Sequence, residues 1–173
     1  MEYDGRAQVQ RVRARVAAAR GDHATAAAAD ELCLEHTDFV LGEMPHHLRA
    51  RIFAGSASYS LARGAILQGE IGAATEHVDH AIGIWRSLAV DFPGWSGSAV
   101  DMLEGLSLRM HLASAVGDKE TALALGRECI DGWRSANDVD VQLAGLATAL
   151  NNFNGIAYAV APDDLETLAE GEA

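Results

Sequence analysis

The sequence predicts an all-α protein built from antiparallel helix–turn–helix repeats, and three observations support that prediction. Alanine dominates the apolar residues, which form 49% of the chain, whereas aromatic residues form only 6%. A glycine followed by an acidic residue recurs with a period of 48 residues, at Gly21-Asp22, Gly69-Glu70 and Gly117-Asp118. Small side chains around these three pairs also coincide when the chain is shifted by one period.

Small residues flank each glycine–acid pair at fixed offsets. Alanine has the highest helix propensity, and a small side chain allows two helix axes to approach closely. We therefore expect these positions to mark where antiparallel helices touch. They lie four residues before, five after and twelve after each glycine, at Ala17, Ala26, Cys33, Ala65, Ala74, Ala81, Ala113, Ala122 and Cys129.

Each glycine–acid pair predicts a turn between two helices. Glycine enters the left-handed conformation that ends a helix without steric cost. The acidic residue beside it is expected where the next helix begins, because a negative charge is favourable at that end of the helix dipole. Pro45 and Pro93 are also one period apart. We expect each in the first turn of the following helix, where its missing N–H goes unused.

The apolar periodicity predicts seven helices. In the segment 72–90, for example, Glu76, Asp79 and Arg86 fall on the helical face opposite the apolar one. That apolar face contains Ala74, Val78, Ala81, Trp85, Leu88 and Ala89. The helices are expected at about 5–20, 23–40, 46–68, 72–90, 96–116, 119–136 and 140–160.

The domain organisation follows from the repeats. Residues 1–161 are predicted to form one helical repeat domain of about three and a half repeats. Pro162 then replaces the expected turn glycine. Residues 162–173 are therefore predicted to form an acidic C-terminal tail or a capping helix.

The chain is acidic, with a net charge of −12 at pH 7. This charge argues against a nucleic-acid partner, because phosphate binding needs a surplus of lysine and arginine. Charges interrupt the apolar stretches well before the roughly 20 residues that a membrane span requires. No basic-then-apolar leader follows Met1, and two distant cysteines predict no disulfide framework. We therefore expect a cytoplasmic protein with neither a membrane nor a nucleic-acid partner.

Charge is distributed unevenly along the chain. Residues 1–20 contain five arginines against two acidic residues, whereas residues 160–173 contain five acidic residues and no basic one. Opposite charges at the two ends favour head-to-tail pairing between chains, which would close a dimer or extend a filament. A homo-oligomer is therefore one hypothesis for this protein.

The order of the small residues resembles the tetratricopeptide repeat over nearly the whole chain. In that family's pattern a small residue of the first helix, here Ala14 and Ala62, precedes the turn glycine, and two alanines of the second helix follow it. The segment LATALNNFNGIAYAVA similarly resembles the first helix of repeats in actinobacterial signalling and transcriptional regulators. The resemblance implies a short right-handed superhelix. The period here is longer than the family's, and Arg13 and Arg109 replace its leucine.

The resemblance also implies a concave groove that binds a peptide or a partner helix. The family's ligand-facing positions form three columns across the first helices of the repeats. Within one helix these positions are three and seven residues apart, so they share a face. The predicted groove residues are Gln8, Arg11, Arg15, Ser56, Tyr59, Arg63, Glu104, Ser107, His111 and Asn152.

One column consists of Arg15, Arg63 and His111, and it predicts an anion-binding wall. Arginine suits that task because its planar fork can bind a carboxylate through two hydrogen bonds. The alternative is that these are ordinary solvated arginines paired with neighbouring acidic residues.

No cofactor, metal or catalytic residue is predicted. His77 and His80 lie one helical turn apart, but a stable metal site needs further ligands from elsewhere, so a solvated pair is the preferred interpretation. Cys33 and Cys129 occupy equivalent small positions and are expected to be buried spacers. The sequence contains no glycine-rich phosphate loop, nucleophile elbow or paired-cysteine metal spacing.

The leading functional hypothesis is a non-catalytic protein-interaction module, such as an adaptor, a scaffold or a regulatory repeat domain. Its partner would be a protein or peptide with acidic character. The alternatives are homo-oligomeric assembly and a small-molecule sensor or biosynthetic enzyme that uses the groove as a pocket. In the last case His77 or His111 would be the first candidates for acid–base work.

Overall fold

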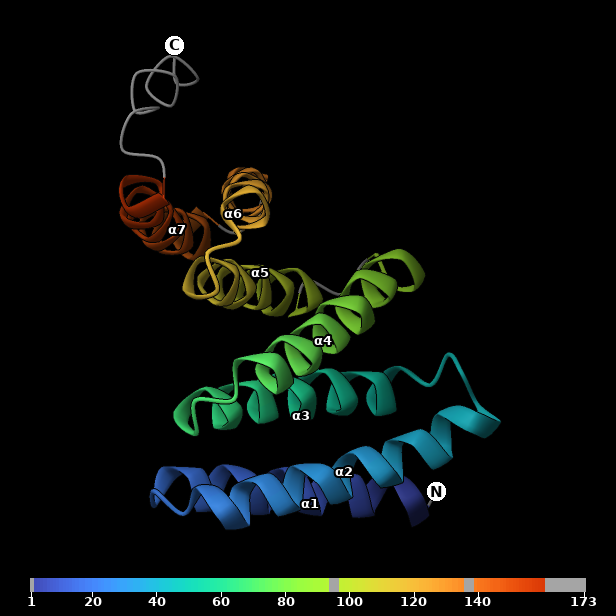
Figure 1. Cartoon of the computed structure of the whole chain (residues 1–173). Coiled ribbons are helices and arrows are strands. Elements are labelled where there is room, and N and C mark those ends of the chain that lie inside the picture. The colour runs from blue at the N-terminus through green and yellow to red at the C-terminus, as the bar shows by residue number, and fades with distance from the viewer. Residues whose placement is uncertain (1, 94–96, 136–138, 161–173) are drawn as a thin grey trace. The chain divides into compact units, whose positions relative to one another are not determined.

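The computed structural model describes residues 2–93, 97–135 and 139–160, and the regular elements within these residues are all α-helices (Figure 1). Consecutive helices pack against each other, α1 on α2, α2 on α3, α3 on α4 and α6 on α7. The helix boundaries agree with the sequence prediction to within three residues, so the predicted fold class is confirmed. The helices are α1 (Glu2–Ala19), α2 (His23–Glu43), α3 (Leu48–Leu67), α4 (Ile71–Asp91), α5 (Gly97–Ala115), α6 (Lys119–Arg134) and α7 (Val139–Val160).

The chain divides into two compact units. The N-terminal unit is Met1–Gly105, and the C-terminal unit is Leu106–Ala173. Helix α5 runs across this division. The predicted acidic tail, residues 162–173, lies outside the described residues.

The three turn glycines adopt the left-handed backbone that the sequence predicts. Gly21 and Gly69 have φ of 77°, and Gly117 has φ of 78°. A side chain at such a φ would be strained, which explains why glycine stands at all three positions. The predicted turns are therefore confirmed.

The acidic residue after each glycine is the N-cap of the following helix. The Asp22 carboxylate accepts a hydrogen bond of 3.0 Å from the backbone N–H of Thr25, and Asp118 accepts one of 3.1 Å from Thr121. The side chain of the same threonine, followed by its backbone N–H, favours the charged carboxylate and lowers the pKa of each aspartate. Glu70 occupies the same position before α4, but its side chain makes no capping bond.

The prediction for the two prolines is wrong. Pro45 lies in the turn after α2, and α3 begins only after His47. The ring of His47 accepts a hydrogen bond of 3.2 Å from the backbone N–H of Ala50, so a histidine caps this helix and places its start beyond the proline. Pro93 likewise lies in the turn after α4, outside the next helix.

The nine small positions of the repeat are all buried, as predicted. Their exposed fractions range from 0% at Cys33, Ala74 and Ala81 to 9% at Ala26. The predicted apolar face of α4 is also confirmed, since Val78, Trp85 and Leu88 are buried with these alanines. Close approach of small side chains therefore sets the helix spacing in both units.

Large side chains fill the remaining space by packing onto glycines of the facing helix. In the N-terminal unit Trp85 of α4 lies against Gly55 and Gly105. In the C-terminal unit Trp133 of α6 lies against Gly145. A β-carbon at any of these glycines would overlap the indole ring, so each aromatic side chain requires its glycine.

Replacement of Gly126 by alanine tests this packing rule. The new β-carbon would overlap the ring of Phe153 and lie 3.0 Å from Sδ of Met110. We expect Gly126→Ala to lower the free energy of unfolding by about 1–3 kcal/mol. Urea denaturation followed by circular dichroism measures this change.

Gly155→Ala is the matched control in the same unit. Gly155 lies within α7, and a β-carbon there meets nothing within 4 Å. Because alanine favours the helix, we expect this change to raise the stability by about 0.5–1 kcal/mol. Two variants that shift stability in the same direction would contradict the packing rule.

Candidate functional site

The predicted groove residues of the N-terminal unit lie on α1, α3 and α5, in different surroundings. Gln8, Arg15, Arg63 and Glu104 are exposed. Arg11, Ser56 and Tyr59 are half-buried. Contacts between α1 and α3 bring the first two repeats together, so their first helices lie side by side as the groove prediction requires.

Arg11 is bound inside the unit. Its Nη1 atom contacts Oδ1 of Asp30 in an ion pair between α1 and α2 and lies 3.5 Å from Oγ of Ser60 on α3. The side chains of Arg11 and Asp30 are only 13% and 3% exposed. Burial raises the pKa of Asp30, and the attraction of Arg11 lowers it only in part. The positive charge of Arg11 is thus neutralised, and the pair joins three helices.

Asp30 is a functional candidate that the sequence prediction missed. One repeat later, the equivalent residue is Val78, which was placed on the buried face of its helix. The repeat register therefore signalled that Asp30 would be buried. A buried carboxylate needs a partner, and Arg11 is the cation that pairs with Asp30.

A pocket of about 200 Å³ lies between α2 and α3, beside this ion pair. We call it the α2–α3 pocket. Most of its wall is small and apolar, with Asp30 and Ser60 as polar groups and Arg63 and His23 as basic ones. It is lined by Ala18, His23, Ala26, Ala27, Asp30, Ser60, Arg63, Gly64 and Leu67.

Arg63 gives this pocket its positive character. Asp30, the one carboxylate in the lining, is already paired with Arg11. Within the described ranges Arg63 makes no ion pair, and the same holds for Arg15, its equivalent one repeat earlier. Two arginines without acidic partners contrast with the surplus of acidic residues that gives the chain its charge of −12.

Tyr59 lies one helical turn before Arg63 and is held by an aromatic contact. Its ring centroid is 5.7 Å from that of Trp85, with the planes tilted by 58°. Burial raises the pKa of Tyr59, as does the nearby charge of Glu104, while Arg63 lowers it. Two other predicted groove residues, Arg63 and Glu104, therefore lie within electrostatic reach of Tyr59.

The remaining predicted residues belong to the C-terminal unit. His111 is exposed, and partial burial of its ring lowers its pKa, which favours the neutral form at physiological pH. The side-chain amide of Asn152 donates a hydrogen bond of 3.4 Å to Oγ of Ser107, so these two predicted residues do come together.

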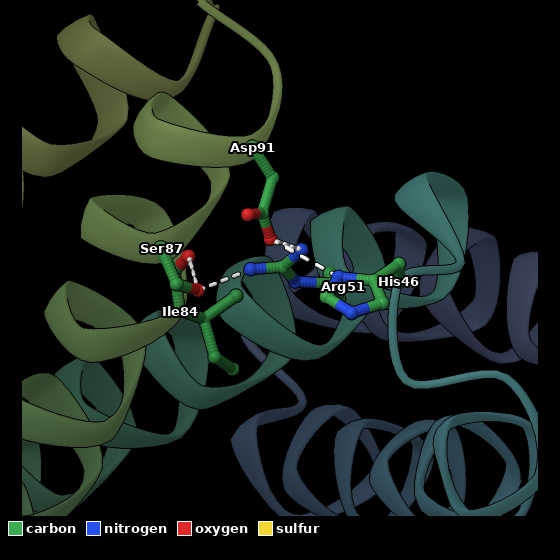
Figure 2. Close-up of polar contacts among 5 residues, drawn as sticks. All are labelled: His46, Arg51, Ile84, Ser87 and Asp91. Carbon is green, nitrogen blue, oxygen red and sulfur yellow. Dashed lines mark hydrogen bonds and ion pairs between the residues drawn. The ribbon is translucent and has the colours of Figure 1, made fainter.

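A second polar cluster joins α3 and α4 at the end opposite the Gly69 turn (Figure 2). The buried guanidinium of Arg51 donates to Asp91 over 2.5 Å and also to Ser87. His46 adds a contact of 3.3 Å to the same carboxylate. The hydrogen bond from Arg51 lowers the pKa of Asp91. This cluster ties the two helices together.

Three of the side chains weighed for chemistry, those of His80, Cys33 and Cys129, have well-defined surroundings in the structure. His80 is exposed, but its ring lies 2.9 Å from Oγ of Ser58, which is fully buried and therefore inaccessible to a substrate. Burial raises the pKa of Cys33 and Cys129 to about 11, which keeps both thiols protonated. Among the described residues no group of three or more His, Cys, Asp or Glu side chains is placed to hold a metal ion.

Comparisons with known proteins do not assign this chain to a family. A scan against protein-family models finds no match, and a search of curated proteins finds no relative. In the part of the chain that the structure describes, no helix is both long and apolar enough to cross a bilayer.

Proposed function

We propose that this protein is a non-catalytic, cytoplasmic interaction module that binds an acidic segment of a partner protein along α1 and α3. The observation that supports this most directly is the pair of equivalent arginines, Arg15 and Arg63, which are exposed and have no ion-pair partner within the described ranges. The tetratricopeptide resemblance implies that both positions belong to a ligand-facing surface. In this proposal they bind carboxylates of the partner.

The α2–α3 pocket supports a peptide side chain as the ligand. Pockets that hold small molecules or cofactors usually measure about 300–1,000 Å³, and this pocket measures about 200 Å³. A single aspartate or glutamate side chain fits such a space better than a cofactor does. Its carboxylate would meet Arg63 at the edge, and its methylene groups would contact the alanines of the wall.

The buried Arg11–Asp30 pair supports the proposal by making the pocket rigid and electrically balanced. Because this pair joins α1 and α2 and reaches Ser60 on α3, it fixes the walls before a ligand arrives. A preformed site loses less conformational entropy on binding than a flexible one. Tyr59 adds an aromatic surface beside Arg63, which favours contact with an apolar residue of the same peptide.

The double variant Arg15→Glu/Arg63→Glu tests the proposal. The probe is a fluorescent peptide with two glutamates in a neutral background, and its binding is followed by fluorescence anisotropy. A hydrogen bond to a charged group contributes about 1.5–3 kcal/mol, so we expect each reversal to weaken binding by about tenfold or more. The same peptide with glutamines in place of the glutamates should not bind.

Lys119→Glu/Arg127→Glu is the matched control. Both residues are exposed on α6, and their reversal changes the net charge of the chain by the same amount. We expect this variant to retain binding, and circular dichroism should show unchanged helicity in both variants. Equal loss of binding in the two variants would mean that only total charge matters, and retained binding by the first would remove the assignment to Arg15 and Arg63.

A further inference from the structure

The outer face of α1 carries a row of exposed valines. Val9, Val12 and Val16 are 56%, 54% and 44% exposed, and their spacing of three and four residues places them on one face of the helix. Exposed apolar rows of this kind mark surfaces that bind another chain. Arg13 and Arg20, seven residues apart, flank the row on one side.

The equivalent face of α3, one repeat later, packs against the preceding repeat. The residues of α3 that are equivalent to the three valines are Ala57, Ser60 and Gly64. All three of them face the preceding repeat. Ala57 packs with Ala7 and Cys33, while Ser60 and Gly64 line the α2–α3 pocket together with residues of α2. The valines of α1 therefore present the inter-repeat surface, and no described element covers it.

An open depression lies beside the valines on this face of α1. It measures about 300 Å³ and lies between the outer face of α1 and the start of α2. Its wall combines apolar and basic groups and is lined by Val12, Arg13, Val16, Ala17, Arg20, Asp22 and Thr25. A partner that fits must bring apolar side chains together with negative charge.

The chain itself contains a segment of that chemistry. Residues 163–172 carry five acidic side chains and no basic one, and the apolar Leu165 and Leu168 are three residues apart. A second α1 is a poorer partner, because two copies would bring Arg13 and Arg20 against the same arginines of the other chain. We propose that residues 163–172 of one copy cover the valine row on α1 of another copy.

In this arrangement the acidic segment stands where the preceding repeat stands against α3. The interface uses different surfaces on its two sides, so each copy can give its segment to one neighbour and receive a segment from another. Such pairing produces a ring if the rotation between neighbouring copies returns to the first copy, and an open filament if it does not. It is independent of the proposed groove residues Arg15 and Arg63.

Two matched variants test the pairing. Val12→Asp/Val16→Asp destroys the receiving face and keeps the segment, whereas Leu165→Asp/Leu168→Asp destroys the segment and keeps the face. The weight-average mass of each full chain is measured by analytical ultracentrifugation at low and high salt. We expect the unaltered chain to assemble at low salt and to approach its single-chain mass of 18.3 kDa as salt screens the charges.

A mixture of the two variants gives the decisive result. Each variant alone should be monomeric, and an equimolar mixture should form a one-to-one dimer, because each supplies the surface that the other lacks. Circular dichroism confirms that both remain helical. An unaltered chain that is monomeric at low salt, or a segment variant that still assembles, would overturn the proposal, and so would a mixture that stays monomeric.

Discussion

Replacement of Asp30 by alanine is expected to lower the free energy of unfolding of the N-terminal unit by about 3–5 kcal/mol. Asp30 is almost completely buried, and its partner Arg11 is only 13% exposed. Without the carboxylate, the guanidinium remains in a site with little access to water and no negative charge. Urea denaturation followed by circular dichroism measures the loss.

The double variant Arg11→Met/Asp30→Leu distinguishes the effect of an unpaired charge from the effect of lost packing. Both charges are then absent, and apolar side chains of similar size fill the space, so the desolvation cost of the ion pair disappears as well. We expect this variant to be close to the unaltered protein in stability. A double variant as unstable as Asp30→Ala would show that packing, and not the unpaired charge, causes the loss.

Replacement of Trp85 by alanine is expected to cost about 3–5 kcal/mol of stability. Trp85 is 2% exposed and lies at the centre of the cluster that joins α3, α4 and α5 within the N-terminal unit. Its loss leaves a large cavity between Gly55 and Gly105 and removes the aromatic contact with Tyr59. Denaturation in urea again provides the measurement.

Trp85→Phe should cost much less than Trp85→Ala, at about 2 kcal/mol or below. The indole N–H is buried, and none of the described residues accepts a hydrogen bond from it. Phenylalanine keeps much of the apolar contact and removes this unsatisfied donor, which offsets part of the lost volume. Equal costs for the two variants would indicate that the indole N–H has an acceptor in solution.

The fold follows from the sequence because its determinants are local and repeated. A positive φ requires glycine at Gly21, Gly69 and Gly117, and close helix contact requires alanine or cysteine at fixed distances from them. Steric requirements of this kind are visible in a single chain when they recur with one period. The place of Pro45 was predicted wrongly because a side chain, the ring of His47, caps α3 and leaves the proline in the preceding turn.

The candidate site was less predictable because its polar contacts are not repeated. The residue one period after Arg11 is Tyr59, and the residue one period after Asp30 is Val78, so the Arg11–Asp30 pair occurs once. The length and direction of the arginine side chain decide which acid it reaches, and helical periodicity carries no information on that choice. The prediction that Arg11 faces a ligand therefore overlooked its internal partner, whereas the exposure of Arg15 and Arg63 could be inferred from the helical face alone.

The difference among the three helix caps has a consequence for motion. Asp22 and Asp118 each hold a backbone amide in the first turn of their helix, whereas the side chain of Glu70 makes no such bond in α4. An amide without such a bond opens more readily, and local opening permits exchange of its hydrogen with water. The first turn of α4 is therefore the place where helix fraying begins, and it exchanges its amide hydrogens faster than the first turns of α2 and α6. Helices that follow the same glycine turn thus differ in how firmly their first turns are held, because the side chain at the start of α4 makes no capping bond.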